Sequence, residues 1–196
     1  VFARSRGVWV QDTKLTADDG ADHDVFGQSV AISGDTIVVG AINDDDGGAN
    51  SGSAYVFVRA EGAWIQQAKL TASDAARDDR FGSSVAISGD TIVVGAAARN
   101  NNVWQDSGAA YVFMRDAAGV WKQEVKLVAN DVANLYNFRF GRAVAIDGDT
   151  IAVTAEKGTG SVYVYVRGDE SWPEQWSQKL IPSDAGADRV GYSLAI

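Results

Sequence analysis

Residues 26–41 read FGQSVAISGDTIVVGA, and this stretch returns further along the chain. Residues 81–96 read FGSSVAISGDTIVVGA, which differs at one position, and residues 140–155 read FGRAVAIDGDTIAVTA. A further copy begins at Val190 as VGYSLAI, so the openings are separated by 55, 59 and 50 residues. A recurring period of this kind is typical of arrays built from one supersecondary unit. The sequence therefore predicts a tandem array whose insertions lie in loops.

The second half of each unit recurs as well. It reads SGSAYVFVRAEGAWIQQAKL at 51–70, SGAAYVFMRDAAGVWKQEVKL at 107–127 and GTGSVYVYVRGDESWPEQWSQKL at 158–180. Residues 1–15, VFARSRGVWVQDTKL, match the end of this segment. Each unit contains four short apolar runs bounded by turn residues, which is the pattern of a four-stranded meander. In the unit that starts at Phe26, we expect strands at 26–32, 36–41, 53–59 and 63–70.

The composition of these strands predicts their order within a sheet. The first strand alternates large and small residues, and the second is apolar on both faces, as a strand covered on both sides must be. The fourth strand carries Gln66, Gln67 and Lys69 and is expected to be outermost. Such a gradient favours an all-β fold, a β-propeller of four-stranded antiparallel blades with about four blades present. Between the first two strands, Gly34 leads a two-residue loop and is expected to take a positive φ.

The overall composition excludes several classes of function. The 196 residues carry a net charge of −9 and no cysteine, which argues against a nucleic-acid partner and excludes disulfides and thiolate chemistry. No apolar run approaches the ~20 residues needed to cross a bilayer, so direct membrane insertion is not expected. The first ten residues lack the apolar stretch of a signal peptide. The chain also begins without methionine, and we expect it to be a piece of a longer protein.

The Phe-Gly openings, the VVGA endings at 38–41 and 93–96, and the AYVF motif that follows resemble FG-GAP repeats. The resemblance implies a β-propeller like that of the integrin α subunit, or of bacterial extracellular proteins with short FG-GAP repeats. It implies secretion to the extracellular space or cell surface and a role in adhesion. The chain departs from the family in having Ile42 and Ala97 where a proline is usual, and Thr154 where glycine is usual.

The units divide the chain into one β-propeller domain or segment covering residues 1–196. We expect a partial blade at 1–25, complete blades at 26–80, 81–139 and 140–189, and another partial blade at 190–196. The favoured interpretation is a segment of a larger ring, which the resemblance makes seven-bladed. Its other blades, or another chain, would then be partners. The alternative is a compact four-bladed ring closed by the terminal strands.

Calcium is the first candidate ligand. In many FG-GAP repeats, an acidic loop between the first and second strands holds calcium, but here that hairpin is only SGDT or DGDT and is too short to surround an ion. The loop between the second and third strands offers hard oxygen ligands instead. Its candidate calcium ligands are Asp44, Asp45, Asp46 and Asn50. The simpler interpretation is a solvated acidic loop.

An aspartate follows the Lys-Leu pair at the same distance in every unit. These structural repeat aspartates are Asp19, Asp74, Asp131 and Asp184. Their recurrence predicts a structural role, most simply capping of the backbone in the turn between blades. Metal binding is the alternative. Asp24, Asp79 and Asp188 recur two residues before the Phe-Gly position.

The long loop of the second unit is the candidate site for a binding partner. It carries a tryptophan, which we expect to be exposed, among amide and carboxylate groups, and the candidate residues are Trp104, Asn101, Asn102 and Asp106. The single histidine, His23, has no serine or second histidine near it in a motif, so catalytic triads and zinc sites are unsupported. Arg167, Gly168 and Asp169 spell an integrin-ligand tripeptide, but the arginine belongs to the repeat and the other two are ordinary hairpin residues.

These patterns favour a non-enzymatic extracellular or surface propeller that binds a protein or glycan through the loops at 42–52 and 97–108. A first alternative is a hydrolase or lyase that acts on a polysaccharide in the propeller channel. A second is a structural element of a larger assembly. No cofactor other than calcium is expected.

Overall fold

The computed structural model describes residues 1–98, 107–131, 137–156, 160–169, 171–183 and 190–196, and throughout these residues the regular structure is β-strand. No helix in the described chain is long and apolar enough to cross a membrane. The strands are β1 (Phe2–Ser5), β2 (Val8–Gln11), β3 (Phe26–Ser33), β4 (Thr36–Ala41), β5 (Ser53–Ala60), β6 (Ala63–Leu70), β7 (Phe81–Ser88), β8 (Thr91–Ala96), β9 (Ala109–Arg115), β10 (Trp121–Leu127), β11 (Val144–Asp147), β12 (Thr150–Ala155), β13 (Ser161–Val166) and β14 (Gln178–Leu180).

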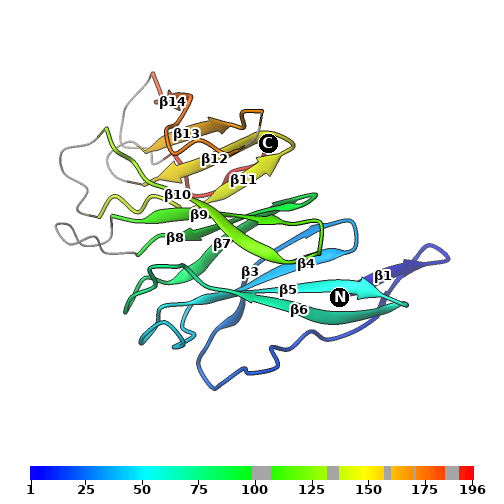
Figure 1. Ribbon diagram of the computed structural model, residues 1–196. Coiled ribbons are helices and arrows are strands. Elements are labelled where there is room, and N and C mark those ends of the chain that lie inside the picture. The colour runs from blue at the N-terminus through cyan, green and yellow to red at the C-terminus, as the bar shows by residue number, and fades with distance from the viewer. Residues whose placement is uncertain (99–106, 132–136, 157–159, 170, 184–189) are drawn as a thin grey trace.

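The described strands form three antiparallel meanders and one hairpin (Figure 1). The sheets have the orders β3-β4-β5-β6, β7-β8-β9-β10 and β11-β12-β13-β14, while β1 pairs with β2. The all-β fold and the four-stranded blades are thus confirmed, and in the first complete sheet the strand bounds match the prediction within one residue. The hairpin glycines Gly34, Gly89 and Gly148 have φ of +55°, +55° and +51°, as expected.

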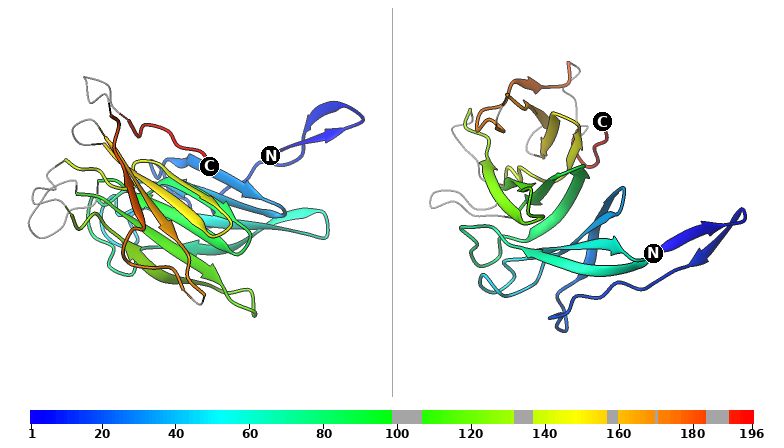
Figure 2. Two further views of the ribbon diagram at one scale, coloured as in Figure 1. Left: turned by 90° about the horizontal axis from the view of Figure 1, so that it is seen from above. Right: turned by 45° about the vertical axis from the view of Figure 1, so that its right-hand side comes forward.

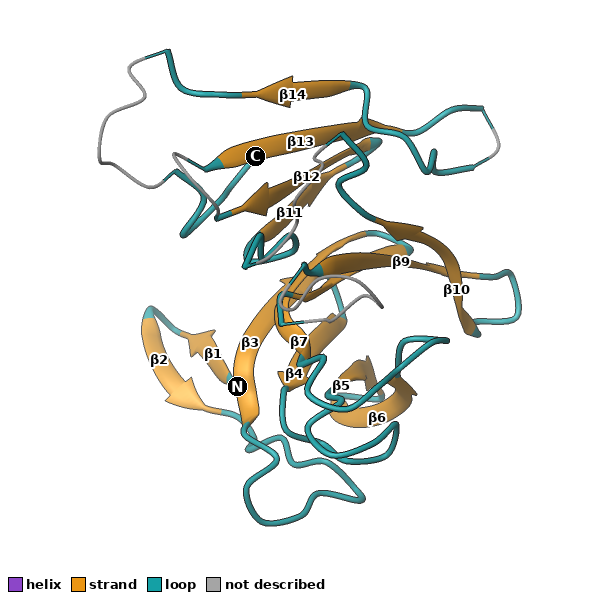
Figure 3. Ribbon diagram, turned by 90° about the vertical axis from the view of Figure 1, so that its left-hand side faces the viewer, coloured by secondary structure: helices purple, strands orange, loops and turns teal. Residues whose placement is uncertain are grey.

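The three sheets follow one another face to face, with their first strands innermost (Figure 2). β7 contacts both β3 and β11, and the fourth strands β6, β10 and β14 lie at the outer edges (Figure 3). The predicted order from inner to outer strand is therefore confirmed. The described sheets do not close into a ring, and β1 and β2 pair only with each other.

Apolar side chains fill the space between neighbouring sheets. Val38 and Val56 from one face of the first sheet pack with Ile92 and Val94 of the second. The opposite face of the second sheet packs in the same way on the third, through the buried residues Val93, Val112, Ile151 and Val153. The second strands are fully buried because both of their faces are covered, which is why they read as continuous apolar runs.

Glycines on the second strands allow them to approach the Phe-Gly backbone of the adjacent sheet closely. A Cβ placed on Gly40 would lie 2.1 Å from the carbonyl oxygen of Gly82, and one on Gly95 would lie 2.1 Å from that of Gly141. Beside these contacts, Ser29 Oγ donates a hydrogen bond of 2.7 Å to Gly82 O, and Ser84 Oγ donates one of 2.9 Å to Gly141 O. Each junction therefore combines a bare glycine on the second strand with a serine hydroxyl on the first.

In the third unit the hydroxyl is on the second strand and the small apolar residue is on the first. This exchange explains why Thr154 replaces the glycine of the repeat. Ala143 stands where the other units have Ser29 and Ser84, and Thr154 stands where they have Gly40 and Gly95. Thr154 Oγ1 donates a 2.8 Å hydrogen bond to Gly191 O and accepts one of 2.9 Å from Ala143 N. The hydroxyl has moved from one strand to its neighbour but still binds the carbonyl of the next Phe-Gly position.

The outer face of the first sheet is less covered than its counterpart in the second. Val30 and Ile32 on β3 are 67% and 61% exposed, whereas Ile87, the equivalent of Ile32, is 8% exposed. The hairpin β1–β2 extends away from this face, and Trp9 on it is 67% exposed. Trp64 and Trp121 stand at the equivalent positions and pack into the apolar clusters of their sheets. Trp9 belongs to none of the apolar clusters of the described residues.

Candidate functional site

The loops that join the second to the third strand, and one sheet to the next, lie at the same end of the sheets. This follows from the meander, because β4 ends where β5 and the next sheet begin. We call it the loop end; the short hairpins such as Gly34–Asp35 mark the opposite end (Figure 1). The predicted calcium loop, residues 42–52, belongs to the loop end.

A lysine occupies the centre of the acidic residues at this end. Lys69 Nζ, on β6, lies 2.6 Å from Asp19 Oδ2, 2.8 Å from Asp44 Oδ2 and 2.6 Å from Asp46 Oδ2. The three carboxylates present oxygens within 4.8 Å of one another. Asp44 also accepts hydrogen bonds from Tyr55 Oη and Ser53 Oγ, both at 2.8 Å. An ammonium group therefore supplies positive charge where these oxygens converge.

The candidate calcium ligands divide between two sets of contacts. Asp44 and Asp46 face Lys69, but Asp45 accepts a 2.7 Å hydrogen bond from the backbone N–H of Asn50. The Asn50 side chain in turn donates to Asp78 at 2.8 Å. Asp45 and Asn50 thus shape the loop, while Asp19, which the sequence assigned to a different role, joins Asp44 and Asp46. Calcium binding here stays a prediction from the sequence.

The pKa shifts of Lys69, Asp19 and Asp44 favour the charged form of each of these three groups. Burial acts to lower the pKa of Lys69, but hydrogen bonds from its ammonium to Asp19, Asp44 and Asp46 outweigh burial and raise that pKa well above its usual value. The hydrogen bond with Lys69 is the main reason that the pKa of Asp19 is lowered. For Asp44, burial raises the pKa, and the bonds from Lys69, Tyr55 and Ser53 more than offset it.

The other two sheets also bring an aspartate, a lysine and a tyrosine together, but there the repeat aspartate accepts the hydrogen bond from the tyrosine hydroxyl, which in the first sheet donates to Asp44. Asp74 accepts hydrogen bonds from Tyr111 Oη at 2.8 Å and Lys126 Nζ at 2.9 Å. Asp131 accepts them from Tyr163 Oη at 3.0 Å and Lys179 Nζ at 2.8 Å. We call each of these groups an Asp–Lys–Tyr cluster. In each of them the lysine also lies over the tyrosine ring, at 4.8 to 5.8 Å from its centroid.

These contacts revise the role expected of the repeat aspartates. Asp19, Asp74 and Asp131 bind the outer strands of the following sheet through side chains, whereas we expected them to cap the turn backbone. The physical reason is that a buried tyrosine hydroxyl and a lysine ammonium need an acceptor more than an exposed turn does. The aspartates two residues before the Phe-Gly position cap the turn backbone instead. Asp24 and Asp79 accept hydrogen bonds from the backbone N–H of Ala21 and Ala76. Asp184 lies outside the described residues.

The sequence contained a signal for these clusters that the motif search missed. Tyrosine and lysine recur in step with the aspartates, as Tyr55, Tyr111 and Tyr163 and as Lys69, Lys126 and Lys179. Each tyrosine ring also packs against the Phe-Gly phenylalanine of its own sheet, with centroids 5.3 to 5.6 Å apart. Co-recurrence of three complementary polar residues would have predicted their contact.

The remaining candidates are placed as follows. The predicted partner-binding residues Trp104, Asn101, Asn102 and Asp106 all lie outside the described residues. His23 has a φ of +77° in the loop before β3, and its carbonyl oxygen accepts a hydrogen bond from Asn43 Nδ2. Arg167 follows β13, where its backbone N–H donates to Asp149 O and Gly168 N–H donates to Ser171 O, the pattern of a local turn.

Stacked four-stranded antiparallel meanders with their first strands innermost define the chain as part of a β-propeller. The sequence profile of the FG-GAP repeat matches residues 9–57, 64–113 and 121–165, most of the chain. The chain therefore belongs to the FG-GAP repeat family, whose repeats are typical of extracellular proteins and of adhesion and binding domains. No curated protein matches the chain.

Each matched segment begins one strand before the sheet that contains most of it. Residues 64–113 begin in β6 and end in β9, so they contain the outer strand of one sheet and the first three strands of the next. The segments 9–57 and 121–165 are placed in the same way. Each repeat thus links two neighbouring sheets.

Proposed function

We propose that the chain forms part of an extracellular or cell-surface propeller that binds a protein or glycan ligand and catalyses no reaction. The observation that carries this proposal is the set of Asp–Lys–Tyr clusters at the loop end. In each sheet, an aspartate from the preceding connection is held by a lysine on the fourth strand. The connections between blades are therefore fixed to the frame.

A fixed frame suits recognition because ordering loops on binding costs conformational entropy. The loops carried by this frame differ between units, from Asn43-Asp44-Asp45-Asp46 in the first to Arg99-Asn100-Asn101-Asn102 in the second. Rigid scaffolds with variable loops are a common basis for binding sites. The family assignment supports the same function.

A loop deletion tests this proposal. Removing residues 99–106 should abolish binding to the ligand identified by a screen of glycans and extracellular proteins, because the sequence places the partner-binding residues there. The melting temperature should stay within a few degrees of the parent, since β8 ends at Ala96 and β9 begins at Ala109, outside the deleted residues. Binding is measured by surface plasmon resonance and folding by circular dichroism.

The matched control shortens a turn at the opposite end. Residues 116–120 between β9 and β10 are replaced by Glu-Gly, the loop found between β5 and β6. This variant should keep full binding. If the 99–106 deletion binds as well as the parent, the placement at the loop end is wrong.

A further inference from the structure

A polar pocket opens at the loop end, among the innermost strands of the three sheets. Its volume is about 510 Å³, which lies within the range of small-molecule sites. Most of the polar lining comes from matching places in successive units: Arg80 and Arg139 precede a phenylalanine, and Gln28, Ser83 and Arg142 follow a Phe-Gly pair. The polar lining residues are Gln28, Asp78, Arg80, Ser83, Arg139 and Arg142.

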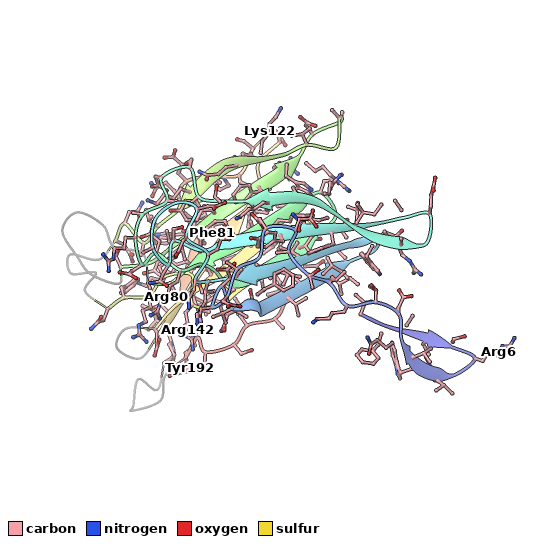
Figure 4. The ribbon with its side chains drawn as sticks, turned by 90° about the horizontal axis from the view of Figure 1, so that it is seen from below. Arg6, Arg80, Phe81, Lys122, Arg142 and Tyr192 are labelled. Atoms are coloured by element: carbon pink, nitrogen blue, oxygen red, sulfur yellow. The ribbon has the colours of Figure 1, made fainter. Side chains whose placement is uncertain are left out.

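The pocket is basic although the chain carries a net charge of −9. Three arginines line it against the single carboxylate of Asp78, which already accepts hydrogen bonds from Asn50 and Arg77. Among the described residues, no ion pair of 4.0 Å or shorter involves Arg80, although its charge interacts with the Asp78 carboxylate. Arg142 stacks on Tyr192 with its guanidinium carbon 5.3 Å from the ring centroid, so its side chain is held at the pocket (Figure 4).

Arg139 also stabilises the fold by pairing with a buried carboxylate. It donates a 3.2 Å hydrogen bond to Glu156, whose side chain is 5% exposed. Arg142 Nε lies 3.8 Å from the same carboxylate oxygen, which is too long for a hydrogen bond. The guanidinium groups of Arg80 and Arg142 therefore keep hydrogen-bonding capacity for a ligand.

The repeats show that the fold does not require arginine at these positions. Val25 stands where the later units have Arg80 and Arg139, and all three have left-handed backbones with φ of +57°, +55° and +50°. Gln28 and Ser83 stand where the third unit has Arg142. The same fold accepts an apolar or neutral residue at each place, so the repeat itself requires no arginine. Glu156 accounts structurally for Arg139, but no ion pair among the described residues accounts for Arg80 in the same way.

We propose that this pocket binds the carboxylate or sulfate groups of an acidic glycan. The inference rests on the proposed function and names its ligand class. Arginine pairs with planar or tetrahedral oxyanions through two parallel N–H donors, and such charged hydrogen bonds are the strong ones. The Gln28 side chain beside the arginines has amide donors and an acceptor that suit sugar hydroxyls, whereas the Ser83 hydroxyl is already bonded to Gly95 O and Ala97 N–H. An acidic glycan carries both kinds of group.

Titration calorimetry with defined probes tests the inference. The probes are trigalacturonate, a sulfated heparin-derived tetrasaccharide, neutral maltotriose and hexaglutamate. One of the two acidic glycans should bind in the millimolar range or tighter, and which one binds distinguishes carboxylate from sulfate. Arg80→Val and Arg142→Gln, each copied from an equivalent position in another unit, should weaken that binding by about tenfold or more.

Arg6→Val is the matched control. This substitution removes the same charge as the pocket variants do. Arg6 also has a left-handed backbone, with φ of +49°, but it lies on the β1–β2 hairpin away from the pocket (Figure 4). Its affinity should stay within about twofold of the parent. Melting curves confirm that each variant is folded.

Three outcomes would overturn the inference: no acidic glycan binds, Arg6→Val loses as much affinity as the pocket variants, or hexaglutamate binds more tightly than either glycan. The proposed function is judged separately. If the ligand found by screening is lost on deleting 99–106 but retained by both arginine variants, the function stands and the pocket is not its site. If the deletion variant and both arginine variants still bind that ligand, the loop placement in the proposed function and the pocket inference are both wrong.

Discussion

Lys69 shows how much of a site a motif search can find. The sequence identified Asp44 and Asp46 as candidate calcium ligands and Asp19 as an aspartate that recurs after each Lys-Leu pair. It assigned them to separate roles, since nothing in a linear pattern says that a lysine 25 residues after Asp44 and 50 residues after Asp19 lies between them. Their meeting depends on β6 pairing with β5 in the observed register.

Lys69→Met should lower the free energy of unfolding by about 3–5 kcal/mol, because it leaves Asp44, with 5% of its side chain exposed, as an uncompensated buried charge. Urea unfolding measures the change. Lys122→Met is the control. That lysine is 68% exposed and pairs with Asp116, so its loss should cost no more than about 1 kcal/mol. Equal losses in the two variants would show that Lys69 is an ordinary surface lysine.

Strands were the most predictable part of this fold, and the contacts between sheets were the least. Period-two patterns and hairpin glycines are local signals, so β3 to β6 could be bounded closely from the sequence. Thr154 was recognised as a departure from the repeat but not explained. Its explanation lies in Gly191 of the following unit, 37 residues away, and in Ala143 on the paired strand.

The exchange between Ala143 and Thr154 predicts a strong coupling between the two positions. Thr154→Gly should lower the free energy of unfolding by about 2–3 kcal/mol, because it leaves the buried Ala143 N–H and Gly191 carbonyl without this partner. Adding Ala143→Ser to it recreates the arrangement of Ser29 and Gly40. The double variant should recover at least about 1 kcal/mol, as a double-mutant cycle would measure. Strictly additive effects would mean that the two hydroxyl positions are not equivalent.

The order of units along the chain and their stacking were predictable from the repeat, whereas the arginine pocket was not. Arg80 and Arg139 share the place before a Phe-Gly pair, but the first unit has Val25 there and no other unit has an arginine at the place of Arg142. The three meet only because successive sheets stack with their first strands innermost. Repetition predicts what every unit shares. The pocket arises from what the units do not share.

The lowered pKa values of Asp19, Asp44 and Asp131 predict acid sensitivity of the stacked sheets. A carboxyl group with a lower pKa in the folded than in the unfolded chain stabilises the fold above its unfolded pKa, about 3.9 for aspartate. That contribution is lost as the pH falls through the folded pKa. The free energy of unfolding should therefore be nearly constant from about pH 7 to 5 and fall steeply below about pH 4.

Asp131→Asn should make this fall shallower, since it removes one of the groups responsible. Asp169→Asn, an exposed aspartate after β13, removes the same charge and serves as control. Urea unfolding at a series of pH values gives both profiles. A profile for Asp131→Asn that runs parallel to the control would contradict the assignment.

Because each FG-GAP match contains the outer strand of one sheet and three strands of the next, the repeat is not the unit that can be cut or grafted. A fragment that begins at residue 64 would carry β6 without its partner β5, and would leave β5 as a bare edge on the piece removed. A cut near residue 80 keeps β3 to β6 and β7 to β10 whole. The array should therefore be lengthened or shortened by exchanging segments with bounds like 26–80. Because each sheet packs on the next, we expect neighbouring sheets to unfold together rather than one at a time.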